Sequence, residues 1–329
     1  MSFRTTQRMT PRMSSKRLLI LLSLLLVATP AIAHKQIAIT LDDLPYVGES
    51  LDDATRATHR LLAALDRHDA RASVFVEGAR VDVESEMRQR IALIRRWQRA
   101  GHFVENHGYA HPAFNDTDLD AYLADVDRGQ ATVRMILDEG QFAGPAGAAF
   151  FRAPFNQTGA TRSNRDALLA HLARTHLRLA PFTVEHADWL FNAVYVDAVE
   201  TGDHVLATRI ADTYLAQLDR AMDHAELLAQ DTFDRPIPQV LLIHANRINA
   251  DHLGTMLDRL HDRGYTFVSM PQALEDDAYA TDDGYAGRWG ISWLHRWRMT
   301  KGLRNALRDE PEPPTWIMQA HEALKATRR

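Results

Sequence analysis

Two adjacent carboxylates, Asp42 and Asp43, follow a short apolar run at residues 37–41, and Pro45 comes two positions later. Ionisable groups at the end of a buried strand are costly unless they are paired or used. A pair of aspartates in a turn or at a helix N-cap is the ordinary alternative. Because neighbouring residues of an extended strand point in opposite directions, we expect one carboxylate to bind a metal ion and the other to act as a base.

The pair His107 and His111 supplies further candidate metal ligands. Imidazole and carboxylate groups suit Zn²⁺ and related divalent ions. Pro112 disfavours helical backbone at His111, so a loop or a single turn is expected here. Histidines at this spacing are usually surface or capping residues. Together with Asp43, however, they would form a His-His-Asp set that leaves coordination positions for water and substrate.

Arg152 follows another apolar run, at residues 149–151. A guanidinium at the end of a buried strand needs an anionic partner. Arg152 either acts as a fork that keeps the Asp42 carboxylate ionised and oriented, or it forms a structural ion pair, and the two interpretations overlap.

His244 follows the apolar run at residues 240–243 and is the candidate general acid. A single histidine in such a position is more often a satisfied core residue. A carboxylate beside it would fix its tautomer and raise its pKa. Asp188, next to Trp189, is the candidate for that carboxylate. One metal-ligand set and one acid–base set together indicate a metal-dependent hydrolase.

The elements that would position these residues alternate along the chain. Helical patterns separate most of seven short apolar runs, and neither a dinucleotide-binding G-x-G-x-x-G nor a phosphate-binding P-loop is present. This alternation predicts parallel strands, and seven of them fit an incomplete (β/α) barrel better than an open Rossmann sheet. The predicted strands are 36–41, 72–76, 102–105, 148–151, 177–183, 240–243 and 265–268. The predicted helices are 51–68, 83–100, 116–138, 163–173, 203–228 and 251–263.

The composition is that of an ordinary globular protein, with 46% apolar and 25% charged residues in a chain of 329. This length suits one large domain or two small ones. The net charge of −5 indicates no nucleic-acid partner, because such proteins carry a basic surface. The sequence does not indicate the oligomeric state.

The N-terminus predicts a cleavable signal peptide at residues 1–33. This segment has five basic residues and no acidic ones, a short apolar stretch at 18–27 and an A-x-A site that ends at Ala33. The apolar stretch is short for a membrane span, which needs about 20 residues. An uncleaved N-terminal anchor is the alternative, and Met13 is an alternative start. We expect a periplasmic or secreted protein, cut after Ala33 and without a stable membrane span, and the absence of cysteine suits an oxidising compartment.

Residues 275–329 are expected to extend the catalytic barrel, which would span residues 34–274. The extension begins with an acidic, loop-like stretch and contains a proline-rich break. Trp289, Trp293 and Trp297 recur every four residues and would share one side of a helix. They would either stack on sugar rings or pack against the barrel. Helical aromatic spacing favours packing, and the rest of the extension would be packed or partly flexible.

Five motifs, taken in order, resemble those of the polysaccharide deacetylases, the NodB-homology group also called carbohydrate esterase family 4. The resemblance covers residues 36–268. The family motifs are T-F-D-D-G-P, H-x3-H-P, R-x-P-[YF], D-x-x-D-W and L-x-H. They are similar to Thr40-Leu41-Asp42-Asp43-Leu44-Pro45, His107 to Pro112, Arg152-Ala153-Pro154-Phe155, Glu185-His186-Ala187-Asp188-Trp189 and Leu242-Ile243-His244. A single match means little, but five in order are specific.

The resemblance implies a distorted (β/α)₇ barrel of the NodB type with its site at the carboxyl ends of the strands, where barrels generally carry their sites. It implies that Asp43, His107 and His111 hold one divalent metal ion. Zn²⁺ is the first expectation, and Co²⁺, Ni²⁺ or Fe²⁺ also suit these ligands. It further implies that Asp42 takes the proton from the attacking water.

By the same resemblance, Asp188 orients His244, which protonates the leaving amine. The backbone N–H of Phe155 would stabilise the oxyanion. Trp189 and Leu242 would line a pocket for the acetyl methyl group.

Three residues depart from the family motifs. Leu44 replaces glycine and would add bulk beside the metal. Glu185 replaces aspartate, which keeps the charge but changes its reach. Phe155 replaces tyrosine, a harmless change where only the backbone acts. These departures concern the substrate more than the chemistry.

The sequence therefore predicts an exported, metal-dependent hydrolase of carbon–nitrogen bonds that removes N-acetyl groups, or O-acetyl groups, from a glycan such as peptidoglycan or an exopolysaccharide. A non-sugar amide or cyclic-imide hydrolase on the same barrel is one alternative, and the complete set of Asp43, His107 and His111 argues against it. A catalytically inactive glycan-binding protein is another, and the presence of both Asp42 and His244 argues against that.

Overall fold

The computed structural model describes residues 1–3, 35–137 and 149–327. It divides the chain into two units, Met1–Ala33 and His34–Arg329. The predicted signal peptide, apart from its first three residues, lies outside the described residues. The same holds for residue 138, where one helix was predicted to end, and for residue 148, where one strand was predicted to begin. In the described ranges, none of the helices combines the length and the apolar character that crossing a bilayer requires.

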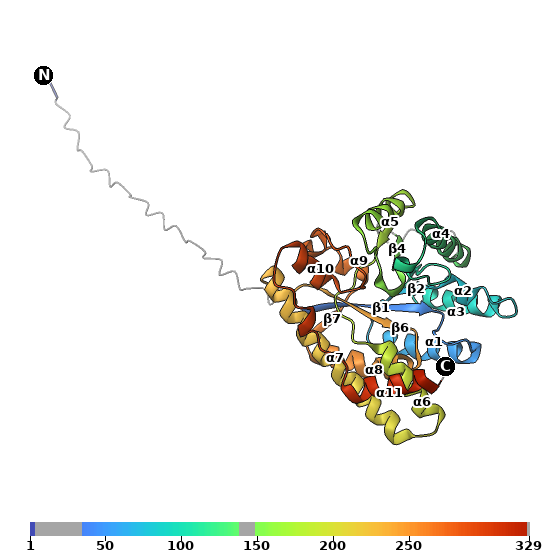
Figure 1. The fold of residues 1–329 in the computed structure, drawn as a ribbon. Helices are drawn as coiled ribbons and strands as arrows, with labels where there is room; N and C mark the ends of the chain where they lie inside the picture. Colours follow the sequence, from blue (N-terminus) through green and yellow to red (C-terminus); the bar gives the residue numbers. More distant parts are fainter. Residues whose placement is uncertain (4–34, 138–148, 328–329) are drawn as a thin grey trace. The chain divides into compact units, whose positions relative to one another are not determined.

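The described part of the second unit is built on one sheet of seven parallel strands (Figure 1). The strand order is β5-β4-β3-β2-β1-β6, and β7 pairs with the start of β1. One bridge between Val184 and Leu241 links the segment after β5 to β6, so the sheet forms a distorted, incomplete barrel. All seven predicted strands are present. They are β1 (Lys35–Leu44), β2 (Ser73–Val76), β3 (Phe103–Asn106), β4 (Ala149–Phe151), β5 (Leu177–Leu179), β6 (Gln239–His244) and β7 (Tyr265–Phe267).

The six predicted helices are also present, with shifted ends. The last of them begins at Arg247 rather than at residue 251, because Asn246 caps it through the N–H of Asn249. The helix α6, which begins at Asp188, was not predicted. The helices are α1 (Leu51–Arg67), α2 (Gly78–Val81), α3 (Met87–Arg99), α4 (Leu119–Ile136), α5 (Arg162–Arg174), α6 (Asp188–Glu200), α7 (His204–Phe233), α8 (Arg247–Asp262), α9 (Met270–Ala273), α10 (Trp293–Thr300) and α11 (Thr315–Thr327).

The register of the parallel strands determines which side chains meet at their carboxyl ends. Asp42 of β1 lies opposite His244 of β6. Asn106 of β3 lies opposite Phe151 of β4, so the residues that follow them, His107 and Arg152, are also neighbours. Every core position of β1 from Ile37 to Leu41 is buried. Hydrophobic burial of this central strand therefore holds the carboxylates in place.

The C-terminal segment contacts the helices around the sheet: α10 contacts α7, and α11 contacts α6. Trp293 and Trp297 are buried within α10, and the Trp297 ring lies edge-on to Phe233 at 5.5 Å. The prediction that three tryptophans share one helix side is wrong for Trp289. This residue precedes α10 and is 74% exposed, because the helix begins only at its Ser292 N-cap.

Candidate active site and metal centre

A cavity of about 560 Å³ lies at the carboxyl ends of β1, β3 and β6. Eight of the ten predicted site residues line it: Asp42, Asp43, His107, His111, Phe155, Trp189, Leu242 and His244. The other two, Arg152 and Asp188, lie behind this lining, each with 1% of its surface exposed. The structure thus brings together residues that span 203 positions of the chain.

Three of these side chains present their metal-binding atoms to one point. The Asp43 Oδ1 atom lies 3.3 Å from His107 Nε2 and 3.6 Å from His111 Nε2. Ligands on a tetrahedral zinc ion with bonds of about 2.0–2.1 Å are roughly 3.3 Å apart. Asp43 Oδ1 is buried and has no hydrogen-bond partner in the described structure. An orphaned carboxylate oxygen beside two imidazole nitrogens fits a divalent cation.

Other groups orient the two histidines. His107 Nδ1 lies 2.8 Å from the carbonyl oxygen of Arg152, so this nitrogen carries the proton and Nε2 is available to a metal. His111 lies in a loop with φ 55°, which confirms that the pair does not share a helix. The Asp125 carboxylate accepts hydrogen bonds from the N–H groups of Tyr109 and Ala110, at 2.8 and 2.9 Å. These bonds hold the loop between the two histidines.

The charges at this point also suit a cation. Burial would raise the pKa of Asp43, but the close approach of His107 and the charges of the nearby imidazoles lower it, so the carboxylate stays ionised. Burial lowers the pKa of His111 to about 4, which keeps its ring neutral. For His107, burial lowers the pKa, but Asp42 and Asp43 outweigh this effect and raise it. A cation bound here would replace the proton that those two carboxylates attract.

The expectation that Asp42 and Asp43 point in opposite directions is wrong. Both carboxylates line the same cavity, and His107 Nε2 lies 3.9 Å from Asp42 Oδ2 as well as 3.3 Å from Asp43 Oδ1. Asp43 has φ 63°, and the pairing of β1 with β2 shifts register between Leu41 and Leu44. A left-handed residue breaks the alternation of an extended strand, so the two side chains converge.

Arg152 contacts the Asp42 carboxylate through one nitrogen, with 3.5 Å between Nη1 and Oδ1. Its Nη2 donates to Thr40 Oγ1 at 3.3 Å and to the Pro181 carbonyl at 3.1 Å. The guanidinium also lies over the Phe75 ring, 4.6 Å from its centroid. Arg152 is therefore fixed from several sides, and it touches Asp42 with one N–H rather than as a two-pronged fork.

His244 and Asp188 form the shortest charged contact of the cavity, with 2.7 Å between Nδ1 and Oδ1. Burial lowers the pKa of His244, but the charge and hydrogen bond of Asp188, together with Asp43 and Asp42, raise it to about 10. Burial would raise the pKa of Asp188, and His244 more than reverses this, so the net shift is downward. These contacts favour the protonated ring of His244, and no described residue hydrogen-bonds to its Nε2.

Two asparagines that the sequence analysis did not identify complete this pair. The Nδ2 groups of Asn246 and Asn249 donate to Asp188 Oδ2 at 2.9 and 2.6 Å, and the His244 N–H donates to the same oxygen at 2.8 Å. Asn246 is also the N-cap of α8. An asparagine two residues after His244, at the start of a helical pattern, is the signal that could have revealed the cap.

The remaining predicted residues surround the opening. Phe155 has φ 54°, and no described residue accepts a hydrogen bond from its backbone N–H. Trp189 is 51% exposed, whereas Leu242 is 1% exposed. The bulk predicted for Leu44 beside the metal is absent from the cavity, because this side chain is fully buried in the core.

Comparison with known families gives one match, over the N-terminal part of the barrel. The family model for Polysaccharide deacetylase matches residues 31–172. Residues 31–172 are therefore similar to the polysaccharide deacetylases, a family of hydrolases that act on non-peptide carbon–nitrogen bonds. No curated protein matches the sequence.

Two solved structures show the same fold. One is a CE4 family pseudoenzyme from Bacillus anthracis, with 18% identity and a TM-score of 0.50 over 74% of this chain and 66% of that one. The other is a polysaccharide deacetylase from Bacillus cereus, with 20% identity and a TM-score of 0.50 over 72% of this chain and 92% of that one. The open parallel sheet with its surrounding helices confirms the predicted distorted barrel.

Proposed function

We propose that this protein is an exported, metal-dependent deacetylase that hydrolyses N-acetyl groups of a glycan and releases acetate. One observation carries the proposal. In a single cavity, the ligand atoms of Asp43, His107 and His111 lie within 4.8 Å of one another. The Asp42 carboxylate and the His244 imidazole line the same cavity. A deacetylase needs this combination of a metal site, a base and an acid.

Asp43, His107 and His111 would hold one divalent cation, with Zn²⁺ as the first expectation. When bound, such an ion polarises a carbonyl oxygen and lowers the pKa of water. Three protein ligands would leave at least one coordination position open for water or substrate.

The protein groups account for the proton transfers. Asp42, held by Arg152, accepts a proton from the attacking water while the water oxygen bonds to the carbonyl carbon of the acetyl group. The N–H of Phe155 donates to the developing oxyanion. His244 then gives its Nε2 proton to the nitrogen as the carbon–nitrogen bond breaks, so acetate and a free amine leave. Asp188 stabilises the imidazolium until that transfer.

The walls of the cavity suit a small acyl group such as acetyl. Leu242 supplies a buried apolar surface and Trp189 a half-exposed aromatic face. An O-acetyl ester would fit the same walls and the same chemistry. Export is proposed from the predicted signal at residues 1–33, so the mature chain would begin at His34 in the periplasm or outside the cell.

Acetate release by the chain from His34 onward tests the proposal. The substrates are N-acetylglucosamine oligomers, peptidoglycan fragments and acetylated xylan, each with and without chelator, and metal content is measured in parallel. Acetate release that chelator abolishes and Zn²⁺ restores supports the deacetylase. A metal-loaded protein that releases no acetate would instead point to a non-sugar amide or imide hydrolase. Absence of both metal and activity would point to a glycan-binding protein.

A further inference from the structure

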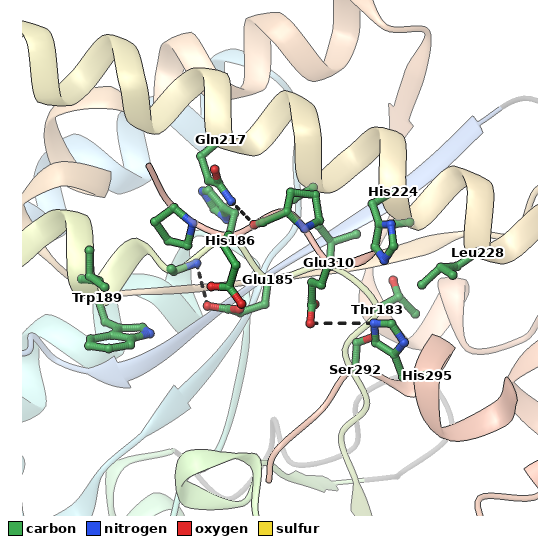
Figure 2. A pocket seen from close by; sticks show the side chains of 18 of the residues that line it. Thr183, Glu185, His186, Trp189, Gln217, His224, Leu228, Ser292, His295 and Glu310 are labelled. Carbon is green, nitrogen blue, oxygen red and sulfur yellow. Dashed lines mark hydrogen bonds and ion pairs between the residues drawn. The ribbon is translucent and has the colours of Figure 1, made fainter. Parts of the chain in front are cut away.

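A second cavity, of about 240 Å³, adjoins the catalytic one, with which it shares two lining residues. Figure 2 shows the side chains that line this second cavity. Its walls come from three parts of the chain: the segment before and at the start of α6, the buried side of α7, and the C-terminal segment around residues 292–318. Glu185 and Trp189 line both cavities. Water occupies about 30 Å³ per molecule in the liquid, so the space equals roughly eight waters and can take one small ring.

Carboxylates without cationic partners surround this second cavity. Glu185, Glu310 and Glu312 line it, and none of its lining residues is a lysine or an arginine. The Glu185 carboxylate accepts a hydrogen bond from the Ala187 N–H at 2.7 Å. The Glu310 carboxylate lies 3.8 Å from the His295 ring, and a neutral ring does not balance its charge. Figure 2 shows Glu185 and Glu310 among the side chains around the cavity.

Two buried imidazoles provide an independent observation. Both ring nitrogens of His186 lack hydrogen-bond partners in the described structure, and so do both of His295. Their residues are 2% and 1% exposed, and both line the cavity. The His186 ring is stacked on Tyr214 with 4.8 Å between centroids, which fixes its orientation. Buried polar atoms without partners are rare, so these nitrogens indicate a ligand that hydrogen-bonds to them.

The electrostatics define the chemistry of that ligand. Burial lowers the pKa of His186 and of His295 to about 4, so each ring is neutral and offers one acceptor and one donor. Burial, with the charges of Glu185 and Glu312, raises the pKa of Glu310 to about 7. A cavity of this kind attracts a cation, and its many acceptors suit a ligand rich in N–H and O–H donors.

We propose that this cavity binds a deacetylated amino-sugar unit, with its ammonium group against Glu310 and Glu185 and its hydroxyls on the imidazoles. The choice of an amino sugar rests on the proposed function, since hydrolysis of an N-acetyl glycan produces such units. Trp189 and Glu185, shared by both cavities, make the second cavity a neighbouring subsite. The enzyme would then favour a glycan that is already partly deacetylated.

The first test is calorimetric titration of the metal-loaded mature chain with glucosamine, and with N-acetylglucosamine as the neutral comparison. We expect saturable glucosamine binding that Glu310→Gln weakens by about tenfold or more, the loss of one charge-assisted contact. Glu200→Gln, on the exposed end of α6, is the matched control and should leave the affinity unchanged. His186→Phe keeps the stacked ring and removes its nitrogens, and it should weaken binding without preventing folding.

Three results would overturn the subsite: no glucosamine binding to the wild type, equal affinity for N-acetylglucosamine, or unchanged affinity in both Glu310→Gln and His186→Phe. Thermal unfolding of each variant shows whether it is folded. Because the titration needs no turnover, it separates the two proposals. Glucosamine binding without acetate release refutes the deacetylase alone, and acetate release without glucosamine binding refutes the subsite alone.

Discussion

Replacing Asp188 by asparagine should change the acid of this site without changing its shape. The Asp188 carboxylate is buried and accepts four hydrogen bonds, one of them from His244 Nδ1 at 2.7 Å. The pKa of His244 is about 10, against an ordinary value of 6.5. This rise corresponds to roughly 5 kcal/mol of preference for the imidazolium.

In Asp188→Asn the charge that causes most of this rise is gone, while the burial that lowers the pKa of His244 remains. The pKa should fall to 6.5 or below in the metal-loaded protein, where the cation offsets Asp43 and burial still disfavours the charged ring. At pH 8 the protonated fraction of His244 would then be at most about 3%, so kcat should fall at least about 30-fold. Activity should partly recover as the pH is lowered toward 6.5. A residue with a merely structural role would show no such recovery.

Two measurements check this prediction. NMR titration of the His244 ring in the Zn²⁺-loaded chain reports its pKa without any substrate, and the pH profile of acetate release reports its effect on turnover. Asp197→Asn, on the same helix, is the matched control. If the His244 pKa stayed above about 9 in Asp188→Asn, or if kcat at pH 8 remained within threefold of the wild type, Asp188 would not be the group that maintains the acid.

Further predictions concern the metal site, the core and the C-terminal segment. Asp42→Asn should retain one metal ion and lower kcat by about 10²–10⁴-fold, whereas His107→Ala should lose both the metal and the activity. Metal analysis together with kinetics distinguishes the two variants. Full activity in Asp42→Asn would exclude Asp42 as the base. Burial raises the pKa of Glu105, which accepts the Phe150 N–H at 2.8 Å, from 4.5 to about 8. As the pH rises, Glu105 loses its proton at a lower pH in the unfolded chain than in the folded protein. The free energy of unfolding should therefore fall by about 4 kcal/mol between pH 5 and pH 9. Glu105→Gln should abolish that part of the pH dependence in urea unfolding, and an unchanged slope would contradict it. Trp297→Ala removes a fully buried ring and should cost about 3–5 kcal/mol of stability, measured by the same method; a loss under 1 kcal/mol would show that this ring does not hold the segment on the barrel.

Local patterns in the sequence were sufficient for much of the fold. The strands are short apolar runs and the helices have a 3.6-residue period, and both signals are properties of neighbouring residues. Polar residues at the ends of apolar runs identified Asp43, His107 and His244, because parallel strands bring their carboxyl ends together. Helix α6 escaped prediction because its apolar residues are not confined to one face.

Tertiary structure decided what depends on long-range contacts and backbone strain. The left-handed backbone at Asp43 directs the Asp42 and Asp43 carboxylates into the same cavity. The alternating side-chain directions of a regular strand do not predict this conformation. The hydrogen bond from Asn249 to Asp188 links residues that are 61 positions apart in the chain.

The sequence by itself determined the family motifs, the candidate ligands and the strand-and-helix order, because each depends on residue type and local spacing. Only the tertiary structure decided that Glu185 and Glu310 border one cavity, 125 positions apart in the chain. The approach of the C-terminal segment to the barrel is produced by the packing of α10 and α11 on α7 and α6, and no local pattern specifies it.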